Sequence, residues 1–169
     1  NGSYKLGSVS IREVNYAEGY SWKFDKTVDA FTTAAEFKKL YEYGVRRIVD
    51  VTADGMGRTP DYVSNVEKET GIRIVHSTGF YKEPFLPERV YSQTVQEMAD
   101  WMIGEIRGGI DGGVKPGMIG EIGTSKNTMT ETEKKVFDAS VIAARETGLP
   151  IYTHTTLGTY APEQAAYFK

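Results

Sequence analysis

The sequence predicts an α/β fold in which parallel strands alternate with helices. Short runs rich in β-branched residues are each followed by a longer amphipathic stretch, and glycine or proline separates them. Alternation of this kind is typical of parallel strands joined by right-handed crossovers. The predicted strands are Ser8–Val14, Arg46–Val51, Ile72–Ser77, Val114–Ile122 and Ile151–Thr155.

Turn residues mark the ends of the helices that follow these strands. Gly44 ends the first helix, Gly71 the second and Gly148 the fourth, and Pro60 suits the first position of the second. The predicted helices are Thr27–Tyr43, Pro60–Thr70, Ser92–Arg107, Thr130–Thr147 and a last one that begins near Pro162.

Two architectures fit this pattern, an open doubly wound sheet and a closed eight-stranded barrel. A complete barrel needs roughly 250 residues and rarely fewer than about 200. The chain has 169 residues. Each βα unit therefore has the length typical of a barrel, but the chain has too few units to complete one. We expect one domain over residues 1–169.

Composition and charge exclude several classes of function. The chain is 40% hydrophobic and 25% charged, which is typical of a globular protein, and its net charge is −3 at pH 7. Nucleic acid is not an expected partner, because phosphate binding needs a concentrated basic surface. No apolar run is long enough to cross a membrane. The chain has no cysteine, which suits both reducing and oxidising compartments; we expect a soluble protein and favour the cytoplasm.

Two histidines and one acidic residue are the candidates for chemistry. His76 and His154 lie near the C-terminal ends of predicted strands, where function concentrates in a barrel. A single histidine in a strand is more often a core residue than a ligand. Glu121, however, lies between isoleucines in the adjacent strand, where a carboxylate needs a cation or strong donors. Glu121 and His154 could share one metal ion; the alternative is a buried salt bridge from Glu121 to Arg58.

Several motifs, in order and across essentially all of the chain, resemble the phosphotriesterase-like family of the amidohydrolase superfamily. Gly120-Glu-Ile-Gly-Thr-Ser and Pro150-Ile-Tyr-Thr-His-Thr resemble strands four and five of that family. Further matches are Gly44-Val-Arg-Arg-Ile-Val-Asp-Val-Thr, Gly57-Arg58, Thr78-Gly-Phe-Tyr and Glu105-Ile-Arg-Gly-Gly-Ile-Asp-Gly. The resemblance implies a (β/α)₈ TIM barrel, of which this chain supplies about five βα units. Members of the family carry two metals at the C-terminal mouth and hydrolyse phosphotriesters, lactones, other esters and some amides.

The resemblance also implies roles for individual residues. Glu121 matches the residue that bridges the two metals, and His154 matches the strand-five ligand. Tyr81 matches an aromatic position that lines the substrate pocket. Asp50 and Arg58 match positions to which we assign structural roles near the site.

The chain departs from the family at the end of strand one. Arg12 and Val14 occupy the positions of the His-x-His pair, and neither side chain can bind zinc. The strand-six histidine and strand-eight aspartate would lie beyond Lys169. We therefore expect one divalent metal rather than two, zinc being the expected ion, held by Glu121, His154 and a residue from elsewhere. Alternatively, Arg12 lies in the substrate pocket with its guanidinium where the other metal would be, paired with Glu121.

The remaining polar candidates have no ligand counterpart in the family. For His76 we favour packing behind the sheet over a place in the barrel mouth. We interpret Lys126 and Asn127 as a solvated loop, and Glu131 and Glu133 as the first turn of a helix, where negative charge is favourable.

Five strands cannot close an eight-stranded barrel, and an open sheet exposes unpaired edges. We favour a second polypeptide that supplies strands six to eight, giving a hetero-oligomer; self-association or a fragmentary sequence are the alternatives. The function expected is that of a metal-dependent hydrolase subunit acting through a metal-activated water. The alternatives are a non-catalytic or ligand-binding half-barrel that assembles with a partner chain, and an open flavodoxin-like sheet that binds phosphate at Gly123-Thr-Ser.

Overall fold

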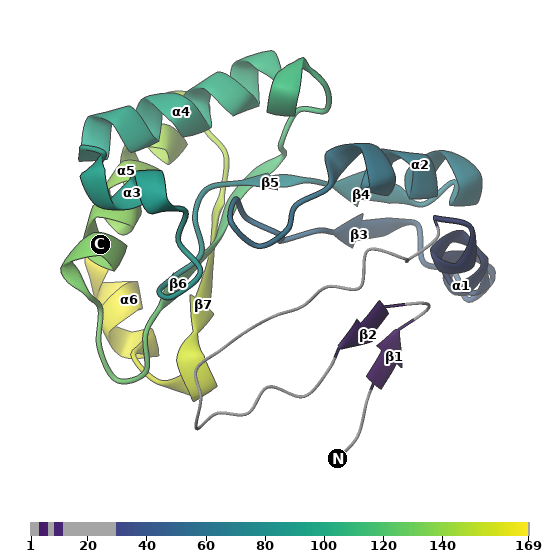
Figure 1. Cartoon of the computed structure of the whole chain (residues 1–169), viewed down its shortest axis with the longest axis horizontal. Helices are drawn as coiled ribbons and strands as arrows, with labels where there is room; N and C mark the ends of the chain where they lie inside the picture. The colour runs from purple at the N-terminus through teal and green to yellow at the C-terminus, as the bar shows by residue number, and fades with distance from the viewer. Residues whose placement is uncertain (1–3, 7–8, 12–29, 169) are drawn as a thin grey trace. The chain divides into compact units, whose positions relative to one another are not determined.

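The computed structural model describes residues 4–6, 9–11 and 30–168 (Figure 1). The chain divides into two compact units, Asn1–Ile48 with Asp61–Ile74 and Val49–Pro60 with Val75–Lys169. The single domain expected over residues 1–169 stays a prediction. All the candidate site residues that the structure describes belong to the second unit.

The first unit contains short strands and two helices. Its elements are β1 (Tyr4–Leu6), β2 (Val9–Ile11), α1 (Ala30–Glu42), α2 (Pro60–Thr70), which begins at the boundary between the units, and most of β3 (Arg47–Val49) and β4 (Arg73–Val75). β3 pairs with β4. The second helix has the predicted bounds, and Gly71 after it has a φ of +73°, a conformation that favours glycine at a helix end.

The first predicted strand differs from the structure. β2 lies within the predicted range, but it pairs with β1, which was not predicted, and the two strands run antiparallel. An antiparallel pair needs only a short connection, so it lacks the long helical crossover by which the other strands were recognised. The remainder of that stretch, including Arg12 and Val14, lies outside the described residues.

The second unit is built on a parallel sheet. Its strands β5 (Ser77–Thr78), β6 (Met118–Thr124) and β7 (Ile151–Thr155) lie in the order β5-β6-β7, and both neighbouring pairs are parallel. This confirms the predicted parallel arrangement for the last two strands, and β7 has the predicted bounds. β6 begins four residues later than predicted, after Pro116, which lacks a backbone donor for strand pairing.

Helices follow each strand of this sheet. They are α3 (Glu88–Ser92), α4 (Val95–Gly108), α5 (Glu131–Thr147) and α6 (Ala161–Tyr167), with 3-10 turns η1 (Ile110–Gly112) and η2 (Thr156–Gly158). The predicted helix Ser92–Arg107 begins instead at Val95, because Thr94 caps α4 through a reciprocal pair of hydrogen bonds with Glu97. α3, which begins after Pro87, was not predicted. None of the helices in the described part of the chain has both the length and the apolar character needed to cross a membrane.

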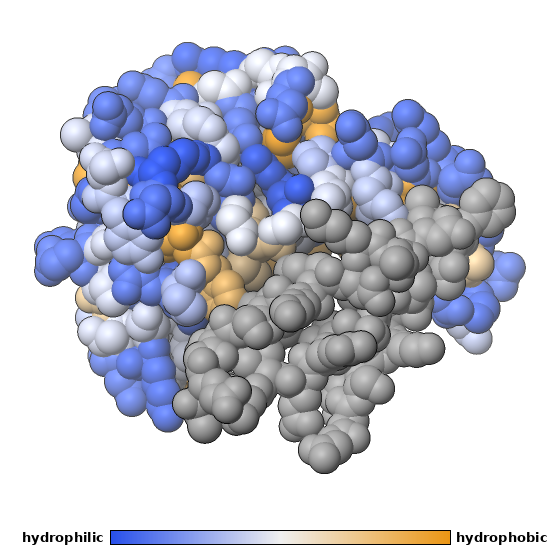
Figure 2. Space-filling model, viewed as in Figure 1, coloured by the Kyte–Doolittle hydropathy of each residue, from blue (hydrophilic) through white to orange (hydrophobic). Residues whose placement is uncertain are grey.

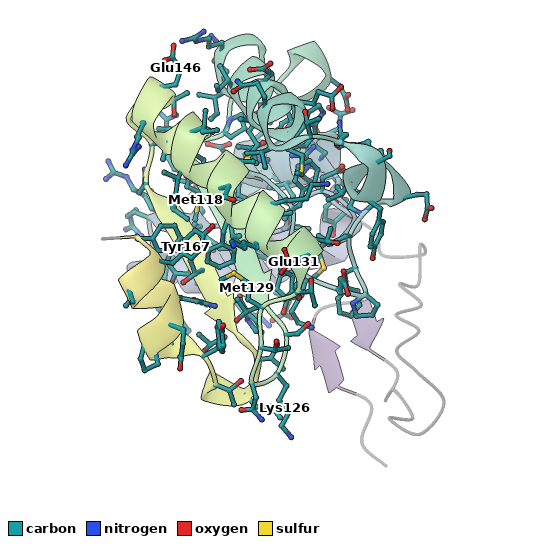
Figure 3. The ribbon with its side chains drawn as sticks, turned by 90° about the vertical axis from the view of Figure 1, so that its left-hand side faces the viewer. Met118, Lys126, Met129, Glu131, Glu146 and Tyr167 are labelled. Atoms are coloured by element: carbon teal, nitrogen blue, oxygen red, sulfur yellow. The ribbon has the colours of Figure 1, made fainter. Side chains whose placement is uncertain are left out.

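The core of the second unit lies where α4 and α5 pack on the sheet. Burying each large apolar side chain there contributes about 1.5–3 kcal/mol. The buried cluster comprises Phe80, Leu86, Val90, Met98, Ala99, Met102, Ile119, Ile122, Val136, Phe137, Ala139 and Ala143. Tyr167 of α6 packs edge-on against Phe137 of α5 with ring centroids 5.7 Å apart, and Figure 3 shows α6 beside α5. The outer surface of the helices is mainly hydrophilic in Figure 2.

Glu133 lies in the first turn of α5, as predicted, and it is fully buried. Its carboxylate accepts hydrogen bonds from the backbone N–H of Thr130 (2.9 Å), from the N–H and hydroxyl of Ser125 (3.1 and 2.7 Å), and from the N–H of Glu83 (3.3 Å). Through these bonds Glu133 joins two loops to the start of α5. Burial lowers the pKa of the neighbouring Lys82, and the negative charge of Glu133 opposes this shift. Lys126, one residue beyond Ser125, projects into solvent as predicted (Figure 3).

Arg58 pairs with Glu105 of α4, not with Glu121 as the alternative had it. Its guanidinium donates to both carboxylate oxygens of Glu105, at 2.8 and 2.7 Å, and to the carbonyl oxygen of Ser77 at 3.3 Å. The hydroxyl of Thr78 also donates to Glu105, at 2.6 Å. Burial, the largest single effect, lowers the pKa of Arg58, but hydrogen bonding to Glu105 and nearby negative charges outweigh it and raise the pKa. This ion pair ties the segment before α2 to α4 and β5.

We expect Glu133→Gln to lower the free energy of unfolding by about 2–3 kcal/mol, because the amide turns a donor toward backbone N–H groups that need an acceptor. Urea unfolding followed by circular dichroism measures the change. Glu131→Gln is the control: Glu131 lies in the same turn but is exposed, so its replacement has little effect. Equal stability of the two variants would contradict the structural role of Glu133.

We expect Glu105→Gln to lower the free energy of unfolding by about 3 kcal/mol, because it leaves the buried guanidinium of Arg58 without a charged partner. The side chains of Arg58 and Glu105 are only 10% and 11% exposed. Glu146→Gln is the matched control, because Glu146 pairs with Arg107 on the surface, with side chains more than half exposed. Thermal unfolding of both variants measures the difference, and a small loss in Glu105→Gln would contradict this role.

Candidate functional site

Glu121, in the middle of β6, and His154, near the C-terminal end of β7, meet across two adjacent parallel strands. His154 Nδ1 lies 2.8 Å from Glu121 Oε1, which is a hydrogen-bond distance. The side chains are 32% and 23% exposed, so solvent reaches both. The structure therefore brings together the carboxylate and the imidazole that the sequence placed on neighbouring strands.

A bulge in β6 turns Glu121 out of the regular alternation of the strand. The pairing passes from Ile119 opposite Ile151 to Ile122 opposite Thr153, so β6 contains one residue more than β7 over this stretch. An extra residue of this kind redirects side chains, and bulges are frequent next to active sites. Glu121 is the one residue of β6 that is not fully buried.

The residue before Glu121 has to be glycine. Gly120 has a φ of +126°, and a Cβ atom there would lie 2.2 Å from the carbonyl oxygen of Tyr152 on β7. The N–H of Glu121 donates to the carbonyl oxygen of Val51 at 3.1 Å. The segment after β3 therefore holds the Glu121 backbone, and the close approach of β7 explains why glycine precedes it.

Tyr81 lies against the His154 ring. The ring centroids are 5.1 Å apart and the planes meet at 67°, an edge-on contact that is favourable between aromatic rings. The carbonyl oxygen of Tyr81 accepts from the N–H of Gly123 at 3.0 Å, and a Cβ atom on Gly123 would approach the Tyr81 ring to 3.1 Å. The Tyr81 side chain is therefore in the site, although only 8% of the residue is exposed.

Asp50 forms hydrogen bonds with its own segment and with a neighbouring strand. Its carboxylate accepts from the N–H and hydroxyl of Thr52 at 3.1 and 2.6 Å, and its N–H donates to the carbonyl oxygen of Val75 at 2.9 Å. These bonds shape the segment that leads to Val51, the residue that contacts Glu121.

His76 is not among the described residues that contact this pair. His76 is 2% exposed, and its carbonyl oxygen accepts from the N–H of Gly117 at 2.9 Å. Its burial agrees with the favoured packing role. Arg12 lies outside the described residues, so its pairing with Glu121 stays a prediction.

Glu121 and His154 form a donor set that suits a divalent metal. One carboxylate oxygen and one imidazole nitrogen are ligands of the kind zinc prefers, and in a tetrahedral site two such atoms lie roughly 3.4 Å apart. A separation of 2.8 Å has to widen only slightly to reach that value. No third His, Cys, Asp or Glu completes a metal-binding cluster within the described ranges, so further ligands would have to come from outside them.

Two further pairs near the site were not predicted. Glu105 binds Arg58, and Asp54 binds Arg89 at 2.5 Å. Arg89 also lies 4.9 Å from the ring centroid of Phe80 and 4.4 Å from that of Trp101. Glu105 could have been noticed, because it shares a helical face with the buried Met98 and Met102.

Comparisons with known proteins agree with the motifs. The sequence model described as the phosphotriesterase family matches residues 8–168. The phosphotriesterase homology protein of Escherichia coli (strain K12) is 41% identical over 150 residues, which is 88% of this chain and 51% of that protein. The aryldialkylphosphatase of Saccharolobus solfataricus is 36% identical over 120 residues, 71% of this chain and 38% of that protein.

The fold agrees as well. The crystal structure of the Escherichia coli phosphotriesterase homology protein, with phosphate in its active site, superimposes with a TM-score of 0.81 at 42% identity, covering 83% of this chain and 49% of that one. The predicted barrel architecture, rather than an open doubly wound sheet, is thereby confirmed. The chain spans about half the length of the relatives it matches. It belongs to the phosphotriesterase family and contributes part of a (β/α)₈ barrel.

Proposed function

We propose that this chain forms part of a metal-dependent hydrolase in which Glu121 and His154 hold one divalent cation, zinc being the expected ion. The proposal rests on the convergence of the two side chains, which are 2.8 Å apart and partly exposed, from β6 and from the C-terminal end of β7. Function concentrates at this end of the strands in barrels of this kind.

Each residue of the site has a distinct part in the proposal. A bound divalent metal lowers the pKa of a water molecule and polarises the carbonyl or phosphoryl group of a substrate. Glu121 supplies a negatively charged oxygen, and His154 supplies a neutral nitrogen. Tyr81 supports the imidazole ring edge-on and shields one side of it from water. Gly120 allows the bulge that turns the carboxylate toward His154.

The proposed substrate is an ester, a lactone, an amide or a phosphotriester. Support comes from the family, in which one relative is an aryldialkylphosphatase and another binds phosphate in its active site. The chain spans about half of the first of those relatives. We propose that the remaining ligands and substrate-binding loops belong to strands six to eight, carried by a second polypeptide, a second copy or a further part of the same polypeptide.

A second candidate function is a non-catalytic or ligand-binding half-barrel that acts in assembly with a partner chain. Arg12 and Val14 stand where the resemblance expects two histidine ligands, and this observation favours it. The two candidates differ in one measurable property, which is whether the assembled protein holds a stoichiometric metal ion at Glu121 and His154.

We expect the assembled protein, loaded with Zn²⁺ and dialysed, to retain about one metal ion per copy of this chain, consistent with one set of protein ligands. His154→Ala and Glu121→Gln should each lose it, because either change removes a donor atom. Elemental analysis measures the metal content, and Glu131→Gln serves as an exposed carboxylate control that keeps it. An assembled wild-type protein with no stoichiometric metal, and no change in thermal stability with chelator, would favour the non-catalytic function.

We expect the assembled protein to hydrolyse at least one of three probes, an aryl phosphotriester, an aryl ester and a γ-lactone. Chelator should abolish the rate and Zn²⁺ should restore it, because the attacking water depends on the metal. The hydrolysis rate is followed by release of the aryl alcohol or, for the lactone, by release of acid. A hydrolysis rate that is unchanged by chelator and by the His154→Ala substitution would contradict the metal-dependent mechanism.

A further inference from the structure

Gln164 on α6 reaches the backbone of His154. Its side-chain Nε2 donates to the carbonyl oxygen of His154 at 2.8 Å and to the hydroxyl oxygen of Thr124 at 2.7 Å. Gln164 is 3% exposed and Thr124 is fully buried. One amide group therefore joins three elements, the end of β6, the end of β7 and the helix that follows.

The contact needs the chemistry of an amide. A primary amide nitrogen carries two hydrogen atoms, and here each has its own acceptor on a neighbouring strand. A carboxylate at this position has no hydrogen to donate, and an apolar side chain of the same length leaves the buried His154 carbonyl without this partner, which is unfavourable. Two distances within the normal hydrogen-bond range indicate a formed rather than incidental contact.

Gln164 belongs to a wider set of bonds at the same strand ends. The hydroxyl of Thr156 donates to the carbonyl oxygen of Thr124 at 2.7 Å, and the hydroxyl of Thr159 donates to the carbonyl oxygen of Thr156 at 2.8 Å. Thr124 lies directly after Gly123, the residue of β6 that is paired with His154. These bonds hold the segment that follows β7 against the end of β6, next to the bond from Gln164 to His154.

We propose that Gln164 is a positioning residue for His154. By fixing the carbonyl group of His154 against β6, it restricts the backbone from which the imidazole projects, and it keeps Nδ1 directed at Glu121. The consequence for metal binding rests on the function proposed above, whereas the consequence for the imidazole itself does not. Groups that orient metal ligands in this way typically change metal affinity by about 10- to 100-fold when they are replaced.

The experiment uses the full chain with ¹³C- and ¹⁵N-labelled histidine, measured without metal. The chain contains two histidines, so His76 is an internal reference for the ring signals of His154. Gln164→Met, which keeps the length and loses the donor, should shift or broaden the His154 ring signals and leave those of His76 unchanged. Gln96→Met is the matched control, because Gln96 donates to Asp100 on the exposed face of α4.

A second measurement separates this inference from the proposed function. Calorimetric titration of the assembled protein with Zn²⁺ should show at least about tenfold weaker binding in Gln164→Met than in wild type or Gln96→Met. Unchanged His154 ring signals in Gln164→Met would overturn the positioning role whatever the Zn²⁺ result. A shift of those signals in an assembled protein that binds no Zn²⁺ even as wild type would support the positioning role and overturn the proposed metal site.

If Gln164→Met does not fold, the wild-type chain still provides a test. The side-chain amide hydrogens of Gln164 should exchange with solvent at least tenfold more slowly than those of Gln96. Both amide hydrogens of Gln164 are hydrogen-bonded and buried, whereas Gln96 is exposed. Equal exchange rates would show that the contact with His154 and Thr124 is not held, and would overturn the proposal.

Discussion

The hydrogen bond between His154 and Glu121 is the contact on which the candidate site depends. It joins two adjacent parallel strands, and the bulge at Gly120 directs the carboxylate toward it. A regular β6 would alternate its side chains between the two faces of the sheet, and the extra residue shifts that alternation at Glu121. The pair remains partly open to solvent, as a site that binds a metal ion and water requires.

Buried polar side chains on the surrounding helices hold the strand ends and loops in place. Glu133 at the start of α5 binds Ser125 and Glu83, Glu105 of α4 binds Arg58 and Thr78, and Gln164 of α6 binds Thr124 and His154. Polar groups without partners are unfavourable in the protein interior. Each helix therefore constrains both the apolar core and the segments that carry the candidate ligands.

Local signals in the sequence predicted some elements well and others poorly. α2 begins at Pro60 and ends before Gly71, and β7 has the predicted ends. Proline, glycine and a short β-branched run determine the backbone conformation of their immediate neighbours, so their effect can be predicted from sequence. α3, the antiparallel β1 and the division of Ser92–Arg107 were missed. The site was found in part: Glu121 and His154 converge as expected, whereas the partner of Arg58 was Glu105, far along the chain.

The sequence by itself determined the residue types, their order and their spacing, and from these follow the parallel βα pattern, the family and the two candidate ligands. Only the tertiary structure decided which atoms meet. The one-residue bulge in β6, the burial of Glu133 and the contact of Gln164 with His154 depend on strand register and on packing between distant segments. Such contacts leave no local pattern, because each partner is selected by position in space rather than by its neighbours in the chain.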